Sequence, residues 1–373
     1  MAGQMVLIGF QGNSVDDKSV QAVAKEIADG TVGGVMFLKT NVFDKTHVVA
    51  INKLFMASAK GGLPPFISVD QEGGAVQRLT EAVGFPSTPS AEDIGKLRLP
   101  TTPQPVSDLY AGTDLTPDPN VPAKPAAALR PLPDQAAARK IYERLATNLA
   151  AWGFNVNFGP VVDLNINPKN PIIAKYGRSY GNQADDVGAY AFSFIDAHHQ
   201  HGVLTALKHF PGHGSSTKDS HAGFVDISKT WDPAEFTSFK YIMRSQAADF
   251  VMVGHLYNTQ LNGPADGMPA SLSHFWITDQ LRGTLQYNGV VITDDMEMAA
   301  VRKLLPDIKK RVITAVKAGE DVLLFSNTSN PRPGIGAEIV RILVDEAKAD
   351  PAFEKRIEQS YARIKTLKTN GLK

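Results

Sequence analysis

The sequence predicts a single-domain (β/α)8 barrel of the TIM type. Eight short apolar runs recur along the 373 residues, and segments with helical spacing of apolar residues lie between them. Near-continuous apolar strands that alternate with helices are typical of parallel strands buried on both faces. Eight such units in a chain of this length favour one closed barrel, and a doubly wound open sheet is the alternative.

Two periodicities place the elements in order. Runs rich in Val, Ile, Leu and Phe predict strands, and apolar residues three and four positions apart predict amphipathic helices. The expected strands are residues 5–10, 32–38, 64–70, 154–159, 203–208, 250–255, 289–294 and 321–326. The expected helices include residues 16–28, 44–59, 134–151, 184–200, 233–247 and 304–318.

One stretch, residues 86–133, interrupts the alternation with eleven prolines. Proline lacks a backbone N–H and its ring blocks a continuing helix, so no helix or strand is expected to persist there. We expect a long insertion after the third strand, on the side of the barrel where the strands end. It can serve as a lid or a substrate-binding wall, or pack as an inert excursion, and the inert interpretation is slightly favoured.

Polar residues occupy the last position of four predicted strands. They are Asp70, Lys208, His255 and Asp294. In a parallel barrel all strands end on one face, so these four side chains are expected to converge there. Core packing alone does not explain four polar strand ends, and the pattern therefore predicts an active site on that face.

Two consecutive aspartates, Asp294 and Asp295, close the seventh predicted strand. A short anionic side chain on a rigid strand end suits a catalytic nucleophile. An aspartate in this place can equally cap the following helix by accepting backbone N–H groups. We expect the two residues to divide these roles, although their spacing alone does not say which one faces the pocket.

The segment 208–221 concentrates titratable side chains directly after the fifth predicted strand. It holds Lys208, His209, His213, Asp219 and His221. Pro211, Gly212 and Gly214 prevent a regular helix through its middle, so an irregular loop is expected. Titratable groups gathered on a loop at a strand end are typical of an active site.

The residues of this loop have two other interpretations. One is a glycine-rich turn with solvated histidines. The other is a metal site formed by His209, His213, Asp219 and His221, since the first two are spaced like a zinc-binding helical pair. Pro211 and Gly212 break the helix that this spacing requires, and the chain has no cysteine ligands. No metal and no other cofactor is therefore predicted.

The composition restricts the partners. Lys plus Arg and Asp plus Glu both number 38, so nothing indicates nucleic-acid binding or a polybasic membrane patch. The absence of cysteine excludes disulfides and thiolate catalysis. No apolar stretch approaches the ~20 residues of a membrane span. A core strand expected as early as residues 5–10 favours a natural leader that has been removed. The location is left open between the bacterial cytoplasm and export. A monomer is expected.

The loop Lys208-His209-Phe210-Pro211-Gly212-His213-Gly214, followed by Asp219-Ser220-His221, resembles the signature of family 3 glycoside hydrolases of the β-N-acetylglucosaminidase branch. Other segments resemble that family in the same order. They are residues 3–10, 69–74 with 77–78, 157–163, 167–171, 177–181, 292–296 and 317–321. The likeness thus spans nearly the whole chain.

The resemblance implies a barrel and a retaining mechanism that removes terminal β-linked GlcNAc, from peptidoglycan-derived muropeptides or chitooligosaccharides. It implies that Asp294 is the nucleophile and that His221 is the general acid/base, oriented by Asp219. The residues implied to hold the hydroxyls of the sugar are Asp70, Arg78, Arg178, Lys208 and His209. These roles agree with chemistry, because a retaining glycosidase needs an anionic nucleophile and a group that first donates and then accepts a proton.

The chain departs from the family pattern at two places. Ala75 stands where the family often carries arginine, and the proline-rich insertion is longer than expected, so recognition beyond the first sugar is left open. The chain also ends after the final barrel helices, and we expect no second α/β domain of the kind that family 3 β-glucosidases carry. This argues against plain glucose specificity.

Three other functions compete with β-GlcNAc hydrolysis. A β-N-acetylglucosaminide phosphorylase is possible, because a neutral histidine lets phosphate approach where a carboxylate would repel it. A second alternative is another family 3 exo-glycosidase that acts on β-glucosides or β-xylosides. A third is a non-catalytic sugar-binding protein on an enzyme scaffold, which the intact Asp219, His221 and Asp294 disfavour.

Overall fold

The computed structural model describes residues 1–99, 132–328 and 330–372, and it contains the predicted barrel. Eight parallel strands form one sheet in the order β11-β9-β7-β6-β3-β2-β1-β12. A parallel bridge between Ile292 and Val322 joins the last strand to β11, so the sheet closes on itself. The open-sheet alternative is therefore wrong, and neighbours in the ring follow the order of the chain.

Each barrel strand lies at a place where an apolar run predicts one. The strands are β1 (Val6–Gly9), β2 (Gly34–Phe37), β3 (Phe66–Val69), β6 (Val156–Asn157), β7 (Leu204–Phe210), β9 (Phe250–Val253), β11 (Val290–Thr293) and β12 (Leu323–Phe325). All residues of these strands are buried, as expected for a sheet covered on both faces. Strand β7 continues two residues past its predicted end, so His209 and Phe210 belong to the strand together with Lys208.

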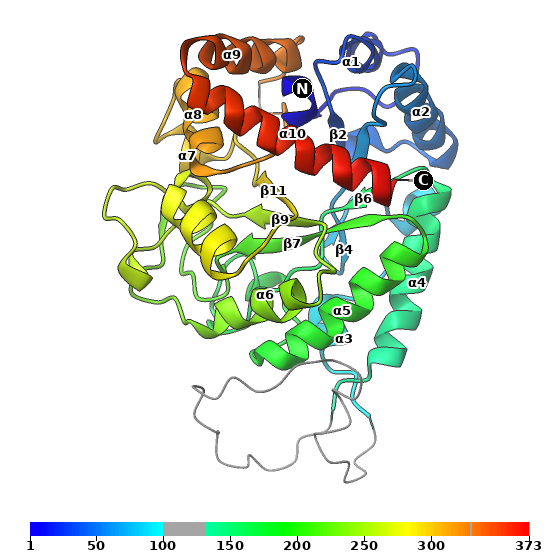
Figure 1. Ribbon diagram of the computed structural model, residues 1–373. Coiled ribbons are helices and arrows are strands. Elements are labelled where there is room, and N and C mark those ends of the chain that lie inside the picture. The colour runs from blue at the N-terminus through cyan, green and yellow to red at the C-terminus, as the bar shows by residue number, and fades with distance from the viewer. Residues whose placement is uncertain (100–131, 329, 373) are drawn as a thin grey trace.

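Helices surround the barrel (Figure 1). The six predicted helices are present as α1 (Lys18–Ala28), α2 (Lys45–Ser58), α4 (Gln135–Ala151), α5 (Ala184–Gln200), α6 (Ala234–Arg244) and α8 (Ile308–Ala318). Aspartates cap three of them, as Asp44, Asp134 and Asp307 accept backbone N–H groups of the first turn. The π-helix η8 (Phe275–Thr284) and the helices α9 (Ile335–Ala349) and α10 (Pro351–Gly371) complete the outer layer.

Short elements occupy the connections between these strands and helices. They are η1 (Ala2–Met5), η2 (Lys39–Asn41), β4 (Gln71–Gly73), β5 (Val76–Gln77), η3 (Glu81–Val83), α3 (Ala91–Ile94), η5 (Ala174–Tyr176), β8 (Val225–Asp226), β10 (Leu256–Tyr257), η6 (Gln260–Asn262), η7 (Ala270–Leu272) and α7 (Ala299–Arg302). Within the described ranges, no helix is both long and apolar enough to cross a membrane.

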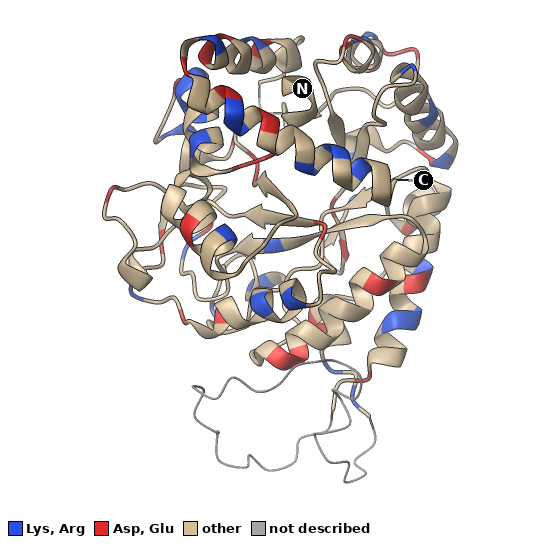
Figure 2. Cartoon of the chain, in the orientation of Figure 1, with Lys and Arg blue, Asp and Glu red and all other residues tan. Residues whose placement is uncertain are grey.

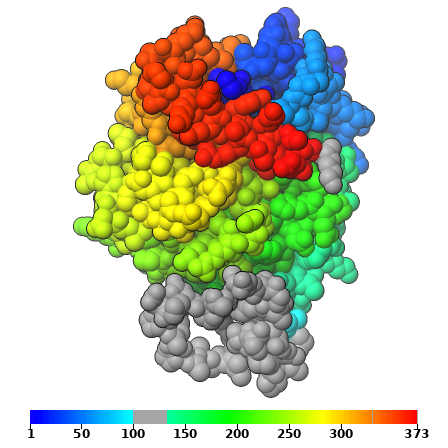
Figure 3. All heavy atoms as spheres, viewed as in Figure 1, coloured from blue at the N-terminus to red at the C-terminus, as the bar shows by residue number. Residues whose placement is uncertain are grey.

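Helix α10 covers the end of the barrel where the strands begin, and it lies across the front of the space-filling view (Figure 3). The buried Lys368 donates to Gln4 Oε1 at 2.7 Å and to the carbonyl of Gly33 at 2.6 Å, just before β1 and β2. Asp321, just before β12, is also fully buried and accepts hydrogen bonds from Arg356 and Ser360 of the same helix. Lys368 and Asp321, both buried at this end of the barrel, therefore find polar partners.

Acidic and basic side chains are interspersed on the helices seen in Figure 2, in line with the zero net charge. Mixed charge of this kind gives no single-sign surface on that face. The view therefore offers no electrostatic footprint of a polyanionic partner.

The proline-rich insertion lies mostly outside the described residues, which omit 100–131. Its beginning contains the one-turn helix α3, so the expectation that no helix persists through residues 86–133 is wrong for that turn. No proline lies between Ser90 and Leu99, and the hydroxyl of Ser90 caps the turn through the N–H of Asp93. A bridge between Arg98 and Pro133 brings the two described ends of the insertion together.

Candidate active site

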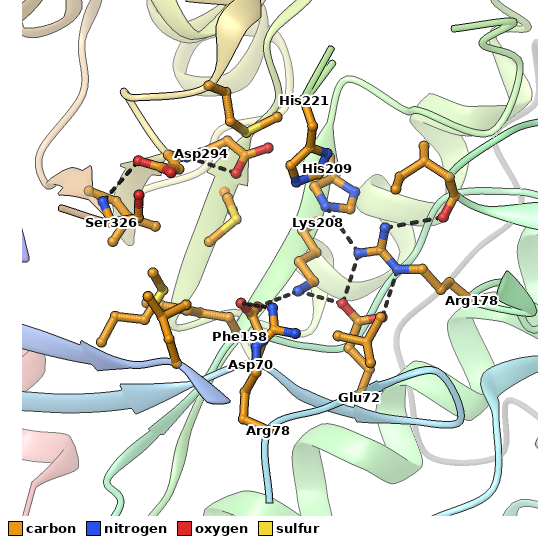
Figure 4. Close-up of a pocket in the computed structure, with 18 of the residues that line it drawn as sticks. Asp70, Glu72, Arg78, Phe158, Arg178, Lys208, His209, His221, Asp294 and Ser326 are labelled. Atoms are coloured by element: carbon orange, nitrogen blue, oxygen red, sulfur yellow. Dashed lines mark hydrogen bonds and ion pairs between the residues drawn. The ribbon is translucent and has the colours of Figure 1, made fainter. Parts of the chain in front are cut away.

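A cavity of about 380 Å³ opens where the barrel strands end (Figure 4). Loops and strand ends from most of the barrel line it. The predicted site residues among its walls are Asp70, Arg78, Arg178, Lys208, His209, His221 and Asp294. The barrel thus brings together seven of the eight residues singled out from sequence, and the eighth, Asp219, contacts His221 from outside the wall.

Five charged side chains form a connected cluster on one side of the cavity. Lys208 Nζ lies 2.9 Å from Asp70 Oδ1 and 2.6 Å from Glu72 Oε1. Arg178 binds both oxygens of Glu72, with Nε at 2.9 Å and Nη2 at 2.8 Å. Arg78 Nη2 reaches Asp70 Oδ2 at 3.2 Å. Figure 4 shows this charged cluster across the cavity from Asp294.

The charges in this cluster hold one another in the ionised state. Burial raises the pKa of Glu72, but the adjacent Arg178 and Lys208 outweigh it and lower the pKa to about 2. Burial likewise opposes the ionisation of Asp70, and Lys208 and Arg78 hold its pKa well below the usual value. The two carboxylates in turn raise the pKa of Lys208 against the effect of burial. The cluster therefore presents fixed donors and fixed acceptors to a polar ligand.

A short hairpin of β4 and β5 places the acidic half of the cluster. The side chain of Gln71, between Asp70 and Glu72, accepts the N–H groups of Arg78 at 2.8 Å and of Leu79 at 3.0 Å. Gly73 has φ +106°, and a Cβ there would come within 2.2 Å of the Pro89 carbonyl. Glycine is therefore required for the hairpin to turn.

His209 is fixed by Asp163, which follows β6. Asp163 Oδ2 lies 2.7 Å from His209 Nδ1, and Asp163 Oδ1 accepts the N–H of His209 at 3.1 Å and of His213 at 2.8 Å. The carboxylate makes Nδ1 the protonated nitrogen, so His209 Nε2 points toward Arg178 Nη2 at 3.5 Å. Asp163 therefore sets both the backbone and the ring of a cavity residue.

The paired aspartates after β11 divide their roles. Asp294 lies in the cavity wall, and its Oδ1 accepts the N–H of Asp295 at 2.8 Å. Burial raises the pKa of Asp294, yet His255, His209 and His221 together with that N–H hold it below its usual value. Burial raises the pKa of Asp295 instead. Both aspartates line the cavity, and Asp294 is the one whose environment favours the ionised form.

Asp295 has a structural role that differs in detail from the expected helix cap. Its Oδ1 accepts the N–H of Ser326 at 2.9 Å and that of Glu297 at 3.0 Å. The residue that precedes α7 is Met298, so Asp295 does not cap this helix. It ties the loop after β11 to the end of β12.

His221 and Asp219 form a pair at the mouth of the cavity. His221 Nδ1 lies 2.8 Å from Asp219 Oδ1, and the same oxygen accepts the N–H of His221 at 2.9 Å. The His221 side chain is 62% exposed and also lines the cavity. An oriented imidazole that borders both solvent and cavity can exchange protons with either.

His255 lies beside Asp295 on the same face of the barrel as the other three strand-end residues, but unlike them it does not line the cavity. Its Nδ1 contacts Ser271 Oγ at 2.7 Å, and its Nε2 contacts the carbonyl of Asp295 at 2.9 Å. Both ring nitrogens are therefore engaged behind the loop that holds Asp294 and Asp295. It still acts on the site electrostatically, through the pKa of Asp294.

Sequence reasoning assigned no role to two buried carboxylates of the site, Glu72 and Asp163. Glu72 lies two residues from Asp70, and the period of an extended chain puts such residues on the same side, so the signal was present. Asp163 gives no comparable signal, because its partners His209 and His213 lie in a distant segment.

The residues considered as metal ligands have other partners. His213 Nδ1 contacts Ser216 Oγ at 2.6 Å, while His209 contacts Asp163 and His221 contacts Asp219. In the part of the chain that the structure describes, no three His, Cys, Asp or Glu side chains are grouped so as to hold a metal ion.

The fold agrees with comparisons to known proteins. The model of the glycosyl hydrolase family 3 N terminal domain matches residues 2–96 and 116–367, and the chain belongs to this family. It is 32% identical over 302 residues to a β-hexosaminidase from Tolumonas auensis, covering 80% of this chain and 76% of the relative. It is 27% identical over 354 residues to β-hexosaminidase A from Pseudoalteromonas piscicida, covering 91% and 53%.

Solved structures extend the comparison. A family 3 β-N-acetylglucosaminidase from Paenibacillus sp. superposes with a TM-score of 0.79 at 28% identity, over 99% of this chain and 61% of that one. A β-N-acetylhexosaminidase from Beutenbergia cavernae gives 0.77 at 28% identity, over 99% and 97%. The chain therefore spans only about half to three-fifths of the Pseudoalteromonas and Paenibacillus proteins, but nearly all of the Beutenbergia protein.

The lowered pKa of Glu72 predicts a specific dependence of stability on pH. The carboxylate stabilises the fold above its unfolded pKa near 4.5, and this contribution is lost as pH falls toward the folded pKa of about 2. We expect urea unfolding of Glu72→Gln to lack that component of the decline in unfolding free energy between these pH values. Glu358→Gln, at an exposed position of α10, should retain it. Parallel curves for the wild type and Glu72→Gln would contradict the prediction.

Proposed function

We propose that the protein is a retaining exo-β-N-acetylglucosaminidase that releases terminal non-reducing GlcNAc. Its substrates are peptidoglycan-derived muropeptides or chitooligosaccharides. The observation that carries the proposal is the pairing, in one cavity, of an ionised Asp294 in the wall with the Asp219–His221 pair at the mouth. The similarity to proteins named β-hexosaminidase and β-N-acetylglucosaminidase supports the choice of sugar.

The first chemical step transfers the sugar to the enzyme. His221 donates a proton to the glycosidic oxygen while Asp294 attacks the anomeric carbon, so the bond to the aglycone breaks as the bond to Asp294 forms. Asp219 accepts from His221 Nδ1, which leaves Nε2 to deliver the proton and stabilises the imidazolium beforehand. The aglycone leaves as a neutral alcohol.

The second step releases the sugar. The neutral His221 removes a proton from water, the water oxygen attacks the anomeric carbon, and the bond to Asp294 breaks. Two inversions at the same carbon return the β configuration. One imidazole thus serves as acid and then as base, and its exposed place at the mouth lets the aglycone leave and water enter.

The charged cluster provides the polar contacts for the sugar. Asp70 and Glu72 accept hydroxyl hydrogens, while Lys208, Arg178 and Arg78 donate to hydroxyl oxygens. On other parts of the wall, Met36, Met252 and Met298 offer polarizable apolar surface. Such surface suits the acetamido methyl group. We further propose that the protein acts as a monomer, since all these groups come from one chain.

The substrate assay tests the proposal directly. Turnover of aryl β-GlcNAc should exceed that of aryl β-glucoside and β-xyloside, and the released sugar should be β-GlcNAc by NMR at early times. A clear preference for glucoside or xyloside would overturn the assignment.

Parallel reactions with millimolar phosphate address the phosphorylase alternative, which an imidazole acid/base favours because it does not repel an anion. Accumulation of GlcNAc-1-phosphate in place of GlcNAc would establish that alternative.

Removing the nucleophile should abolish the covalent step. Asp294→Ala and Asp294→Asn are expected to fold and to lower kcat by roughly 10³-fold or more, measured on an aryl β-GlcNAc. Asp295→Asn should instead lower the melting temperature, because the carboxylate that holds the Ser326 and Glu297 N–H groups is replaced. A larger loss of kcat in Asp295→Asn than in Asp294→Asn would reverse the two roles.

Replacing His221 should slow both steps, but unequally. With an activated aryl leaving group, His221→Ala should spare the first step, so the glycosyl-Asp294 intermediate accumulates with a burst and a low KM. Asp219→Ala should give a weaker form of this pattern, because it misorients the imidazole without removing it. Azide, which needs no general base, should partly restore turnover and yield the β-glycosyl azide. An unaltered rate, or only the α-azide, would remove His221 from this role.

A further inference from the structure

The loop that carries His221 has a buried base and an exposed tip. Residues 212–216 are buried, whereas residues 217, 218, 221, 222 and 224 are exposed. At the tip, one contact to a distant segment is the hydrogen bond from Lys303 Nζ to the carbonyl of Ala222, at 3.4 Å. Nearby, Ser220 Oγ contacts His213 Nε2 at 3.3 Å and the ring of Phe224 packs on Tyr257. The position of the imidazole therefore depends in part on how the base of the loop is held.

Glu235, in the first turn of α6, holds the buried base of the loop by hydrogen bonds. Its side chain is fully buried, and its carboxyl accepts the N–H of Gly214 at 2.7 Å through Oε2 and the N–H of Ser215 at 3.1 Å through Oε1. One carboxyl group thus fixes two successive peptide units of the loop. Burial, reinforced by the nearby charge of Asp163, raises the pKa of Glu235 to about 8.

The contact with Glu235 requires glycine at two positions of the His-Phe-Pro-Gly-His-Gly segment. A Cβ on Gly212, which has φ +124°, would come within 2.5 Å of Glu235 Cβ. A Cβ on Gly214 would lie 1.7 Å from the Leu164 carbonyl and 2.9 Å from Glu235 Oε2. The backbone can approach the carboxyl only because both positions lack a side chain.

The opposite side of the loop base is held as well. Asp163 Oδ1 accepts the N–H of His213 at 2.8 Å, and Asn170 Nδ2 donates to the carbonyls of His213 at 2.7 Å and Gly214 at 3.1 Å. Asp163 and Asn170 follow β6, whereas Glu235 comes from the helix that follows the loop. Glu235 therefore fixes Gly214 and Ser215 relative to α6, in addition to the packing of Phe210 on Phe236 and Phe239 of that helix.

We propose that Glu235 is a positioning residue for the acid/base, which holds the loop at Gly214 and Ser215 so that His221 reaches the glycosidic oxygen. This inference rests on the role of His221 in the proposed function. Glu235 touches neither the cavity nor His221, so it acts through the loop backbone. Its loss should mimic a displaced acid/base and leave the nucleophile intact.

The test compares leaving groups. In Glu235→Ala, kcat/KM for methyl β-GlcNAc, whose leaving group needs protonation, should fall by about 10²-fold, the cost of a misplacement near 1 Å. For 2,4-dinitrophenyl β-GlcNAc the fall should be much smaller, because this leaving group needs little acid assistance. Azide should accelerate turnover of the dinitrophenyl substrate, as in His221→Ala. Glu235→Gln, which retains one acceptor oxygen, should lie between Glu235→Ala and wild type.

Glu320→Gln is the matched control, since Glu320 is equally buried but lies before β12, at the opposite end of the barrel. It should leave the ratio of the two substrates unchanged, even if it alters stability. An equal fall for both substrates in Glu235→Ala, without acceleration by azide, would reduce Glu235 to a stability role and overturn the proposal.

Amide hydrogen exchange tests whether Glu235 holds the loop without relying on an activity assay. Glu235→Gln should increase exchange in residues 212–224, and Glu320→Gln should not. Unchanged exchange there would overturn the proposal even if the kinetics changed. If the wild type hydrolyses no β-GlcNAc substrate, the proposed function fails, while increased exchange would still assign Glu235 to holding this loop.

Discussion

Closure of eight parallel strands into one ring is the constraint on which the rest of this molecule depends. Since all strands run the same way, every carboxyl end opens on the same face, and residues hundreds of positions apart meet there. Asp70, Lys208 and Asp294 share one cavity for this reason. The bridge from Ile292 to Val322 completes the ring and thereby brings the Asp294 loop beside Ser326.

The ring also brings charges into a place where they must be paired. A carboxylate or ammonium group removed from water costs several kcal/mol unless another charge offsets it. Glu72 is buried between Arg178 and Lys208, and Lys208 in turn lies between Glu72 and Asp70. The cluster is therefore polar, ionised and rigid at once, which are the properties that a site for a hydroxyl-rich ligand requires.

Much of this arrangement was predictable because the sequence carries it locally. Apolar runs mark each of the eight barrel strands, and Asp294 and Lys208 are visible as polar groups at their ends. What sequence does not carry is the direction of a side chain within the folded ring. His255 lies behind the loop of Asp294 and Asp295 because Ser271 and the Asp295 carbonyl engage its ring nitrogens. Glu235 reads as an ordinary surface residue of an amphipathic helix, and only the packed loop reveals it as buried.

The contact between Lys368 and Gln4 joins opposite ends of the described chain, 364 positions apart. A ring of strands has no geometric first member, and here the last helix is fastened to the residues just before the first strand. Which strand comes first in the sequence is thus decided only by where the two chain ends lie in the ring. A circular permutant, with residues 1 and 372 linked and new ends in an exposed loop away from the cavity, would preserve every strand neighbour in the ring.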